Sequence, residues 1–387
     1  DLRARRVPAL DSGALSLRVV TVNTGADTVK AALADVEAGV AHVLVQHVEP
    51  RPASGGCRVE VLRALRAVAP DPAHVEAVGH RVVHGGPFHD SILIDDRIES
   101  ALETFARFAR RHNTAALEGI ATAGEVFPGR PMVAVFDTGF HAHRPPESMR
   151  YALPADVVER LGLVRYGFHG LAHASLVRAL ARATAVQSAR VTAVTLQLGA
   201  GCSACAVEEG RSIETSMGFT PLEGLVMTTR CGDVDPGAVL TLVDQGYEPE
   251  DAWSLLGERS GLLALGGSAS VLELLALENV GDVKAGLALR IFVRRIAMMV
   301  GGYLTLLAGR GAIVFGGGIG TNSAAIRARV ATALRAWDVR LDANRNEAGA
   351  PGEISAPGTR PVWVFSTDEE REIAEETARV LADRTTR

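Results

Sequence analysis

The chain has 387 residues, is 47% hydrophobic and 22% charged, and carries a formal net charge of −5 at pH 7. A chain of this length is expected to fold as about two domains around a large buried core. The slightly acidic balance offers no basic surface for nucleic acid or an anionic membrane, and the four cysteines are too few for a disulfide framework. We therefore expect a cytoplasmic protein with neither a nucleic-acid nor a membrane partner.

The first predicted strands occur at equivalent places in the two halves of the chain. Residues 1–16 are expected to form an N-terminal tail, and the β-branched run Leu17–Val22 that follows stops at a glycine turn. Val191–Leu198 has the same character and stops at Gly199-Ala200-Gly201. Apolar runs that end at glycine are typical of buried strands in an α/β sheet. Their repetition predicts a duplicated α/β fold with a cleft between the halves.

A third strand, Ala312–Phe315, leads into Gly316–Gly320 and then into an alanine-rich helix at 323–337. A strand, a glycine turn and a helix in this order direct backbone N–H groups and a helix N-terminus at a bound phosphate. One glycine turn alone is weak evidence, because most only reverse the chain. Periodicity predicts further helices at 101–111, 114–126, 173–185, 250–256, 284–307 and 368–384.

These elements predict two domains. The first covers 17–140, and the C-terminal helix at 368–387 is expected to pack back onto it. The second covers 141–367. Within the longest apolar helix, 284–307, three arginines favour a buried amphipathic helix over a membrane span.

Thr215–Pro236 is the stretch with the densest set of candidate chemical groups. Its single cation, Arg230, offers a rigid donor fork that suits carboxylate or phosphate oxygens. Two interpretations are open at this point: a substrate-binding arginine, or a surface arginine paired with a nearby acid. The acids in question are Glu214, Glu223, Asp233 and Asp235.

Four further stretches each carry one candidate side chain, which is an arginine, an acid or a histidine. Each candidate lies next to a predicted strand, a predicted helix or a pair of glycines. Arg81 in GHRVVHGG and Asp137 in VFDTGFH lie near the ends of apolar runs, where open α/β sheets bind ligands. His112 lies between two predicted helices, and His169 in YGFHG is flanked by glycines. Taken singly, each is more often structural. The chain has no second C-x-x-C for a zinc site and no G-x-S-x-G elbow, which disfavours a transition-metal site and a serine hydrolase.

Taken together, these stretches resemble one family. GHRVVHGG, VFDTGFH, RYGFHG, ETSMGFTPLEGL with TRCGDVDP, GGGIGTNS and STDEE occur in an order that resembles the acetate kinase family, over about Val19 to Thr377. The resemblance implies an α/β, duplicated actin/Hsp70-like (ribonuclease H-like) two-domain fold with an interdomain active-site cleft, usually as a homodimer. It also implies a Mg²⁺-dependent transfer of a phosphoryl group between ATP and a small carboxylic acid, giving an acyl phosphate.

The resemblance implies roles for individual residues. Arg81 and Arg230 match the arginines that bind the carboxylate and the phosphoryl group in transfer, and Asp137 matches the catalytic aspartate. His169 matches the histidine that acts in the transition state, and His112 matches a second histidine of the site. The remaining implied residues are Asn23 and Glu369 on the magnesium side, Val83, Arg111, Phe168 and Pro221 at the acyl pocket, and Thr28, Lys30, Gln197, Gly199, Gly201, Gly318, Gly320 and Asn322 on the phosphates.

The nucleotide side departs from the family pattern. Gln197 and Ala200 stand where the family has a histidine and an asparagine, and Thr321 stands in place of a glutamate. The segment SASVLE at 268–273 lacks the family's aspartate and arginine. Asp27 adds a negative charge beside the expected phosphate loop, where it would either repel a polyphosphate or serve as a metal ligand.

The acceptor side keeps its charged groups, but Arg111 replaces an apolar pocket leucine, and whether it points into the pocket is open. Three hypotheses follow. The chain is an ATP-dependent carboxylate kinase, or an enzyme of the same fold that uses pyrophosphate or phosphate and acts on a larger or more acidic carboxylate, or a catalytically weak regulatory homologue.

Overall fold

The computed structural model describes residues 16–25, 28–51, 55–105 and 110–385, with the backbone alone at 105, 110–112 and 385. Within them the chain forms two compact units. One contains the chain up to Ala142 together with the segment from Asp368 onwards, and the other spans His143–Thr367. Apart from Ser16, the predicted N-terminal tail lies outside the described residues.

The first unit is built on one six-stranded mixed sheet. Strand β1 (Leu17–Thr24) pairs antiparallel with β2 and parallel with β4, and β4 pairs parallel with β6. The order across the sheet is β3-β2-β1-β4-β6-β5. The other strands are β2 (Thr28–Glu37), β3 (Val40–Pro50), β4 (Ala77–Val82), β5 (Ile92–Leu93) and β6 (Met132–Phe136).

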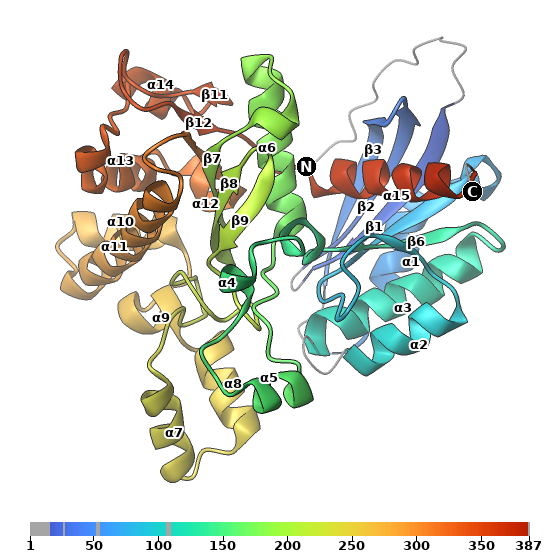
Figure 1. The fold of residues 1–387 in the computed structure, drawn as a ribbon, viewed down its shortest axis with the longest axis horizontal. Coiled ribbons are helices and arrows are strands. Elements are labelled where there is room, and N and C mark those ends of the chain that lie inside the picture. Colours follow the sequence, from blue (N-terminus) through green and yellow to red (C-terminus); the bar gives the residue numbers. More distant parts are fainter. Residues whose placement is uncertain (1–15, 26–27, 52–54, 106–109, 386–387) are drawn as a thin grey trace. The chain divides into compact units, whose positions relative to one another are not determined.

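Side-chain alternation along β1 supplies two cores, because successive residues of a strand point to opposite faces. Val20 and Val22 belong to a core shared with helices α1 (Arg58–Val68) and α3 (Arg110–Val126). Val19 belongs to a second core, shared with helix α15 (Glu369–Thr385). Helices therefore cover both faces of the sheet, with α15 along one and α1 and α3 along the other (Figure 1).

Close packing of α15 on β4 depends on Gly79. A Cβ atom on Gly79 would lie 2.2 Å from Oγ1 of Thr377 and 2.7 Å from Cγ2 of Ile373. Interiors packed this tightly do not absorb such an overlap, so a larger residue would displace α15 from the sheet. The contact fixes the position of Glu369, at the start of α15, relative to Arg81 on β4.

The second unit repeats this arrangement. Strand β7 (Ala193–Leu198) pairs antiparallel with β8 and parallel with β10, and β10 pairs parallel with β12. The order is β11-β12-β10-β7-β8-β9, the same succession as in the first unit once β7 is matched to β1 and β10 to β4. The duplication predicted from the glycine turns is thus present. The other strands are β8 (Cys202–Glu208), β9 (Arg211–Thr215), β10 (Ala312–Gly316), β11 (Gly352–Glu353) and β12 (Val362–Val364).

Most predicted helices are present with shifted ends, and the helix predicted at 101–111 can be compared only in part, because residues 106–109 lie outside the described residues. The described residues of that range are helical, at the end of α2 (Asp96–Phe105) and at the first described residues of α3. His112, predicted to lie between two helices, lies within α3. The remaining helices are α4 (Pro146–Met149), α5 (Ala155–Leu161), α6 (Gly170–Thr184), α7 (Pro236–Asp244), α8 (Pro249–Glu258), α11 (Val283–Leu306), α14 (Ala343–Ala348) and the 3₁₀ turns at 72–74, 139–141, 188–190 and 335–337.

The glycine run after β10 is helical, whereas the sequence predicted a turn. Gly317–Asn322 forms α12, and α13 (Ala324–Ala333) follows at once. The hydroxyl of Ser323 caps α13 by accepting a hydrogen bond from the backbone N–H of Ile326 at 3.3 Å. Gly317 has a φ of 73°, and a Cβ there would lie 2.5 Å from the carbonyl oxygen of Leu198. Close approach to β7 therefore requires glycine at this position.

One described stretch, Gly261–Asn279, has the length and hydropathy of a membrane span. In the structure it consists of two helices, α9 (Gly261–Gly266) and α10 (Val271–Asn279). Gly267 separates them with a φ of 83°. A spanning helix needs about 20 continuous residues, and neither helix approaches that length.

Candidate active site

Arg81 and Asp137 form a bidentate ion pair at the carboxyl ends of neighbouring parallel strands. Arg81 is near the end of β4, and Asp137 directly follows β6. Nε of Arg81 donates to Oδ1 of Asp137 at 3.1 Å, and Nη2 donates to Oδ2. The side chain of Asp137 is 1% exposed and that of Arg81 is 11% exposed. Open α/β sheets bind ligands at this edge.

The third nitrogen of Arg81 contacts the residues predicted to lie on the magnesium side. Nη1 donates to Oδ1 of Asn23 at 3.0 Å and lies 4.0 Å from Oε2 of Glu369. Nδ2 of Asn23 donates to Glu369 at 2.9 Å and to Glu370 at 3.2 Å. Nζ of Lys30, the cross-strand neighbour of Asn23, lies 3.8 Å from Oε1 of Glu370. Four residues predicted from the sequence thus share one cluster with the aspartate of the ion pair.

Glu370 belongs to this cluster, although the sequence did not single it out. It is 3% exposed, and burial raises its pKa while Lys30 opposes the rise. The run STDEE did contain a signal, because acids in the first turn of a helix interact favourably with its dipole. The family resemblance, however, pointed to the first of the two glutamates.

The two members of the ion pair respond differently to burial. Burial raises the pKa of the Asp137 carboxyl, and the adjacent Arg81 guanidinium opposes that rise. Burial works to lower the pKa of Arg81, but the carboxylates of Asp137 and Glu369 outweigh it, and the net pKa is raised. Arginine is charged at any physiological pH, so the cluster presents a fixed cation.

The glycine turn after β4 is anchored by Asn113 of α3. The backbone N–H of His84 donates to Oδ1 of Asn113 at 3.0 Å, and Nδ2 of Asn113 donates to the carbonyl oxygen of His84 at 2.9 Å. Val83, a predicted pocket residue, is held directly before this contact and is 4% exposed. This is a structural role for Asn113 that the sequence did not reveal.

Three other predicted residues are placed less completely. The side chains of Arg111 and His112 lie outside the described residues, so their roles stay predictions. Thr28 begins β2, and its carbonyl oxygen accepts a hydrogen bond from the backbone N–H of Gly25 at 2.8 Å. The two residues between them, Asp27 included, are outside the described part of the chain.

In the second unit, His169 and Arg230 both reach Gly201. A Cβ atom built on Gly201 would lie 3.1 Å from Nε2 of His169 and 3.4 Å from Nη1 of Arg230. An imidazole and a guanidinium therefore meet at the loop after β7, where glycine leaves room for them. Nη1 of Arg230 also donates to the carbonyl oxygen of Pro221 at 3.4 Å. Four residues predicted from the sequence are thus brought together here.

His169 has an unusual backbone. It precedes α6 with a φ of 59°, in the left-handed region, which for a residue other than glycine costs about 1–3 kcal/mol. Gly167, two residues earlier, donates its N–H to the carbonyl oxygen of Gly218 at 3.2 Å. Phe168, a predicted pocket residue, is 1% exposed between them. Strain of this kind persists only where surrounding contacts hold it.

The glycine loop after β7 lies close to the start of helix α12, which follows β10. The backbone N–H of Gly199 donates to the carbonyl oxygen of Gly201 at 3.0 Å. A Cβ on Gly199 would lie 3.9 Å from the backbone nitrogen of Gly318, which is exposed. Backbone N–H groups in glycine loops are typical phosphate ligands, so three predicted phosphate-binding glycines are grouped at one place.

Gln197, Gly320 and Asn322 are placed differently from those glycines. Gln197 lies on β7 just before the loop, and its buried Oε1 has no hydrogen-bond partner among the described residues. Gly320 is buried in α12, with Leu198 and Phe315 as neighbours. Asn322 is exposed at the end of α12. Their roles in phosphate binding stay predictions.

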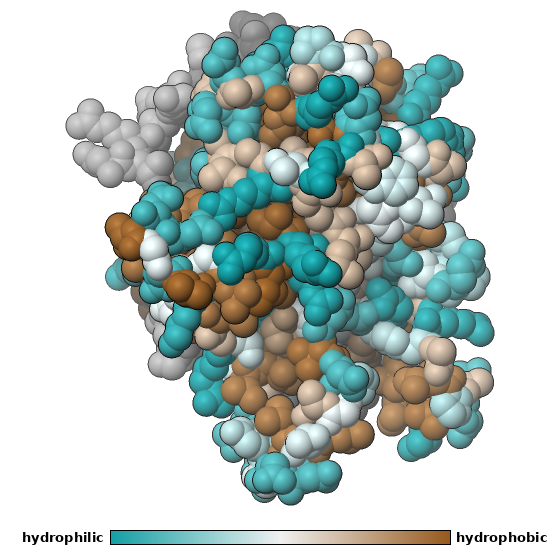
Figure 2. Space-filling view, turned by 90° about the vertical axis from the view of Figure 1, so that its left-hand side faces the viewer, coloured by the Kyte–Doolittle hydropathy of each residue, from teal (hydrophilic) through white to brown (hydrophobic). Residues whose placement is uncertain are grey.

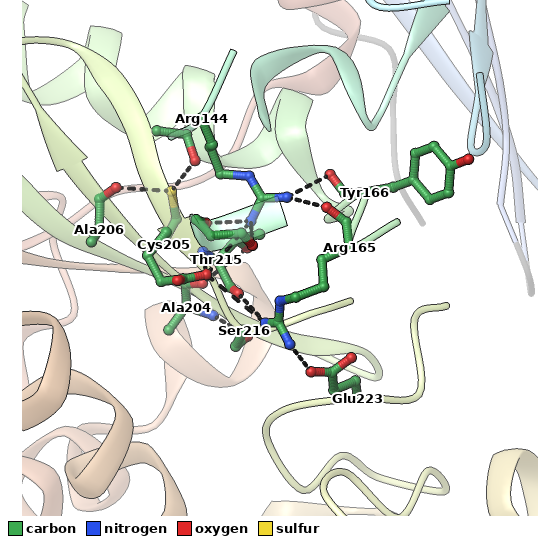
Figure 3. A network of polar contacts seen from close by, with 12 residues as sticks. Arg144, Arg165, Tyr166, Ala204, Cys205, Ala206, Thr215, Ser216 and Glu223 are labelled. Atoms are coloured by element: carbon green, nitrogen blue, oxygen red, sulfur yellow. Dashed lines mark hydrogen bonds and ion pairs between the residues drawn. The ribbon is translucent and has the colours of Figure 1, made fainter. Parts of the chain in front are cut away.

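A network of two arginines ties the RYGFHG segment to Thr215–Pro236. Arg144, whose side chain is fully buried, donates to two carbonyl oxygens of the RYGFHG segment. Arg165, within that segment, donates to the carbonyl oxygen at the start of Thr215–Pro236 at 3.2 Å and to the carboxylate of Glu223 (Figure 3). The network therefore fixes the segment that carries the histidine to the stretch that carries Arg230.

The acids near Arg230 in the sequence are each held by another group. Asp233 and Asp235 stabilise the local backbone, and Glu214 and Glu223 belong to the arginine network. Asp233 accepts from the backbone N–H of Gly224 and Asp235 from that of Gly237, while Glu214 pairs with Arg144, and Glu223 with Arg165 and Tyr151.

The cysteines of the C-x-x-C are structural. Cys202 and Cys205 are buried in β8, and burial raises the pKa of each thiol to about 12, which opposes thiolate formation and metal binding. Among the described residues, no group of three histidine, cysteine, aspartate or glutamate side chains could hold a metal ion. Mg²⁺ does not require one, because it commonly binds through one or two carboxylates together with substrate phosphates.

The sequence matches the family model described as "Acetokinase family" over residues 53–375. The acetate kinase of Micrococcus luteus is 44% identical, over 82% of this chain and 84% of its own. Those of Pseudarthrobacter chlorophenolicus and Methanosarcina thermophila are 40% identical (94% and 98% covered) and 41% identical (83% and 81% covered). The chain belongs to the acetokinase family.

Solved structures agree with this assignment. A propionate kinase from Francisella tularensis superposes with a TM-score of 0.83 at 32% identity, and the acetate kinase of Porphyromonas gingivalis with 0.82 at 31%. In both cases 94% of this chain and 100% of the other are covered. The predicted family, the duplicated actin/Hsp70-like α/β fold and the class of phosphotransferase with a carboxyl acceptor are confirmed. The alternatives, a donor other than ATP or a regulatory homologue, are not favoured.

Proposed function

We propose that this chain transfers a phosphoryl group between ATP and acetate, with acetyl phosphate as the acyl phosphate. Membership of the acetokinase family supports this, since relatives that are 40–44% identical are named acetate kinases. The substituted nucleotide-side residues, Gln197 and Ala200, adjoin glycine loops whose backbone N–H groups do not depend on side chains. ATP binding through those loops is therefore compatible with both substitutions.

The reaction requires positive charge more than it requires a base. Transfer to a carboxylate brings two anions together, so catalysis is mainly charge neutralisation and in-line alignment. The acceptor carboxylate is already ionised near neutral pH. We infer that Arg81 binds this carboxylate, and that Asp137, whose carboxylate binds Arg81 through both oxygens, orients the arginine and does not accept a proton.

The observation that carries the proposal is the approach of His169 and Arg230 to Gly201. Two donors directed at one point of a phosphate-binding loop suit the equatorial oxygens of a phosphoryl group in transfer. Removal of one such donor typically lowers kcat by about 10²–10³-fold. We therefore assign both residues the role of stabilising the transition state of phosphoryl transfer.

The cluster around Arg81, Asn23 and Glu369 in the first unit provides groups that suit Mg²⁺. Its oxygen donors are those of Asn23 and Glu369, which hydrogen bonds hold in place, and oxygen is the ligand that Mg²⁺ prefers. When bound, Mg²⁺ supplies charge neutralisation for the phosphates of ATP. Lys30, fixed beside Glu370, adds a cation on the same side.

We also infer that the enzyme is a cytoplasmic homodimer. Figure 2 shows apolar surface in the lower part of the view, where α7 and α8 lie. Monomers rarely expose a large contiguous apolar patch. A dimer should elute with twice the chain's mass of 40.7 kDa in light-scattering chromatography, and a mass of one chain would contradict it. The exposed large apolar side chains of these two helices are Leu240, Val243 and Trp253.

Trapping of the product with hydroxylamine tests the function. The protein, acetate and Mg-ATP should give acetohydroxamate, and chelation of Mg²⁺ should stop its formation. Mg-ATP should also raise the melting temperature, because a ligand that binds the folded state stabilises it. If acetate and propionate give no hydroxamate with ATP, or if pyrophosphate raises the melting temperature and ATP does not, the proposal is wrong.

A further inference from the structure

His169 is contacted from the interior by a row of buried polar side chains. Nδ1 of His169 lies 2.9 Å from Oγ of Ser203, and the same oxygen lies 2.9 Å from Nε2 of His173. Nδ1 of His173 lies 2.8 Å from Oγ1 of Thr195. Ser203, His173 and Thr195 are all 0% exposed. We call this row, from His169 to Thr195, the histidine relay.

The fold itself aligns the relay. His169 and His173 are one helical turn apart at the start of α6, so their side chains share a face. Ser203 of β8 pairs with Gln197 of β7, two residues beyond Thr195. Residues two apart on a strand, and residues paired across strands, point to the same side of the sheet. Ser203 and Thr195 therefore both face α6.

The number of hydrogens that the side chains can donate restricts the direction of the hydrogen bonds in the relay. Burial, and then the nearby His169, lower the pKa of His173 to about 3, so His173 is neutral near pH 7. A neutral imidazole donates from one ring nitrogen and accepts at the other, and a hydroxyl donates one hydrogen. When Ser203 donates its one hydrogen within the row, the bonds run in a single direction, either toward His169 or away from it.

We propose that the relay runs toward His169 and keeps the proton of its neutral ring on Nε2. In this direction Thr195 donates to Nδ1 of His173, and Nε2–H of His173 donates to Ser203. Ser203 then donates to Nδ1 of His169. Ser203 and His173 are thus positioning residues for His169.

This inference rests on the proposed role of His169 in phosphoryl transfer. Nε2 is the ring nitrogen near the Gly201 loop, and an Nε2–H group donates to phosphoryl oxygens, whereas a lone pair there would repel them. The side chain of His169 makes no capping hydrogen bond to α6, so the helix end does not orient the ring. The contact of Nδ1 with Ser203 is the one through which the relay acts on the ring.

Paired substitutions separate this role from a merely structural one. Ser203→Ala should lower kcat by about 10- to 100-fold with little change in the KM for acetate, because a misoriented or wrongly protonated histidine binds substrate but acts poorly in the transition state. His173→Gln places an amide nitrogen near the position of Nε2 and should retain most activity. His173→Asn reaches only the position of Nδ1 and should behave like Ser203→Ala. Ser212→Ala, equally buried in the neighbouring strand, is the control and should keep full turnover.

A spectroscopic measurement reads the proton position directly. In protein labelled with ¹⁵N-histidine, with the His169 signals identified by their loss in His169→Gln, Nδ1 should resonate as an unprotonated acceptor at pH 7 and Nε2 as a protonated nitrogen. In Ser203→Ala the two tautomers should mix. A protonated Nδ1 in the wild type, full kcat in Ser203→Ala, or an equal loss in Ser212→Ala would overturn the inference. If the wild type forms no acyl phosphate, the proposed function fails, but the ¹⁵N spectrum still decides the direction of the relay.

Discussion

The carboxylate of Asp137 is bound through both oxygens by Arg81, and the same guanidinium donates to Asn23. One arginine thus links the end of β6 to the end of β1. In a buried pair of this kind, removal of one partner costs about 3–5 kcal/mol, because the other charge is left uncompensated. The pair therefore couples the stability of the first unit to the position of Arg81.

Asp137→Asn tests this coupling. The substitution keeps the shape of the side chain and removes its charge, so kcat should fall by about 10²-fold or more, and the free energy of unfolding should drop by a few kcal/mol, of the order given for a broken buried pair. The matched control is Asp35→Asn, which breaks a bidentate pair with Arg18 on the same sheet in a more exposed setting. Exposed pairs contribute about 0–1 kcal/mol. Equal effects in the two variants, measured by denaturant unfolding and turnover, would contradict the assignment.

Arg230→Ala should abolish most turnover and leave the fold intact. The guanidinium contacts the Pro221 carbonyl and the Gly201 loop, so its loss removes a donor from the phosphoryl group, worth about 10²–10³-fold in kcat. Arg230→Lys should recover little, because an ammonium does not reproduce the rigid donor fork. Arg211→Ala, at an exposed position on β9, serves as control. Unchanged acyl phosphate formation in Arg230→Ala, with a native circular dichroism spectrum, would rule out the assignment.

Glu369→Gln should raise the Mg²⁺ concentration needed for half-maximal activity by about tenfold, in line with the loss of a metal-side group. The substitution removes one charge but keeps an oxygen that can accept from Asn23, so the melting temperature without Mg²⁺ should change little. Glu376→Gln, further along α15 and bonded to Ser91 and Arg379, should leave the Mg²⁺ requirement unchanged. A titration of activity against Mg²⁺ distinguishes the two, and identical curves would show that Glu369 is not on the metal side.

The sequence predicted the site residues best where they lie in short segments with a recognisable local pattern. Arg81 lies near the end of one strand and Asp137 directly follows another, and the repeated glycine turns anticipated the two matching sheets. Local patterns could also be misread. Glycine usually marks a turn, but Gly317–Asn322 is helical, and the close approach of Gly317 to β7 leaves no room for a side chain at that position.

Residues that depend on packing between distant segments could not be predicted. Ser203 and His173 are ordinary members of a strand and a helix until α6 packs on β7 and brings their side chains together. Asn113 likewise acquires its role only because α3 packs beside the turn after β4. A strand or helix pattern states which residues share a face, but it does not state which face of another element will meet them.

Buried neutral histidines predict that the fold loses stability in acid. Burial lowers the pKa of His80 from 6.5 to about 3, and its ring nitrogens have no hydrogen-bond partner among the described residues. Between these two pKa values the unfolded chain binds a proton that the folded chain does not. Stability therefore falls as pH falls from about 6.5 toward 3, by roughly 1.4 kcal/mol per pH unit for each such histidine.

His80→Leu isolates this contribution. Between pH 7 and pH 5, the free energy of unfolding of the variant should depend less steeply on pH than that of the wild type. The difference in slope should correspond to the uptake of about one proton, because leucine has no proton to bind in the unfolded state. His74→Leu is the matched control, since the side chain of His74 is 69% exposed and is not buried by folding. Urea unfolding at several pH values gives the slope for each protein. If wild type and His80→Leu lose stability in parallel as the pH is lowered, His80 is not the buried neutral group that makes the first unit acid-sensitive.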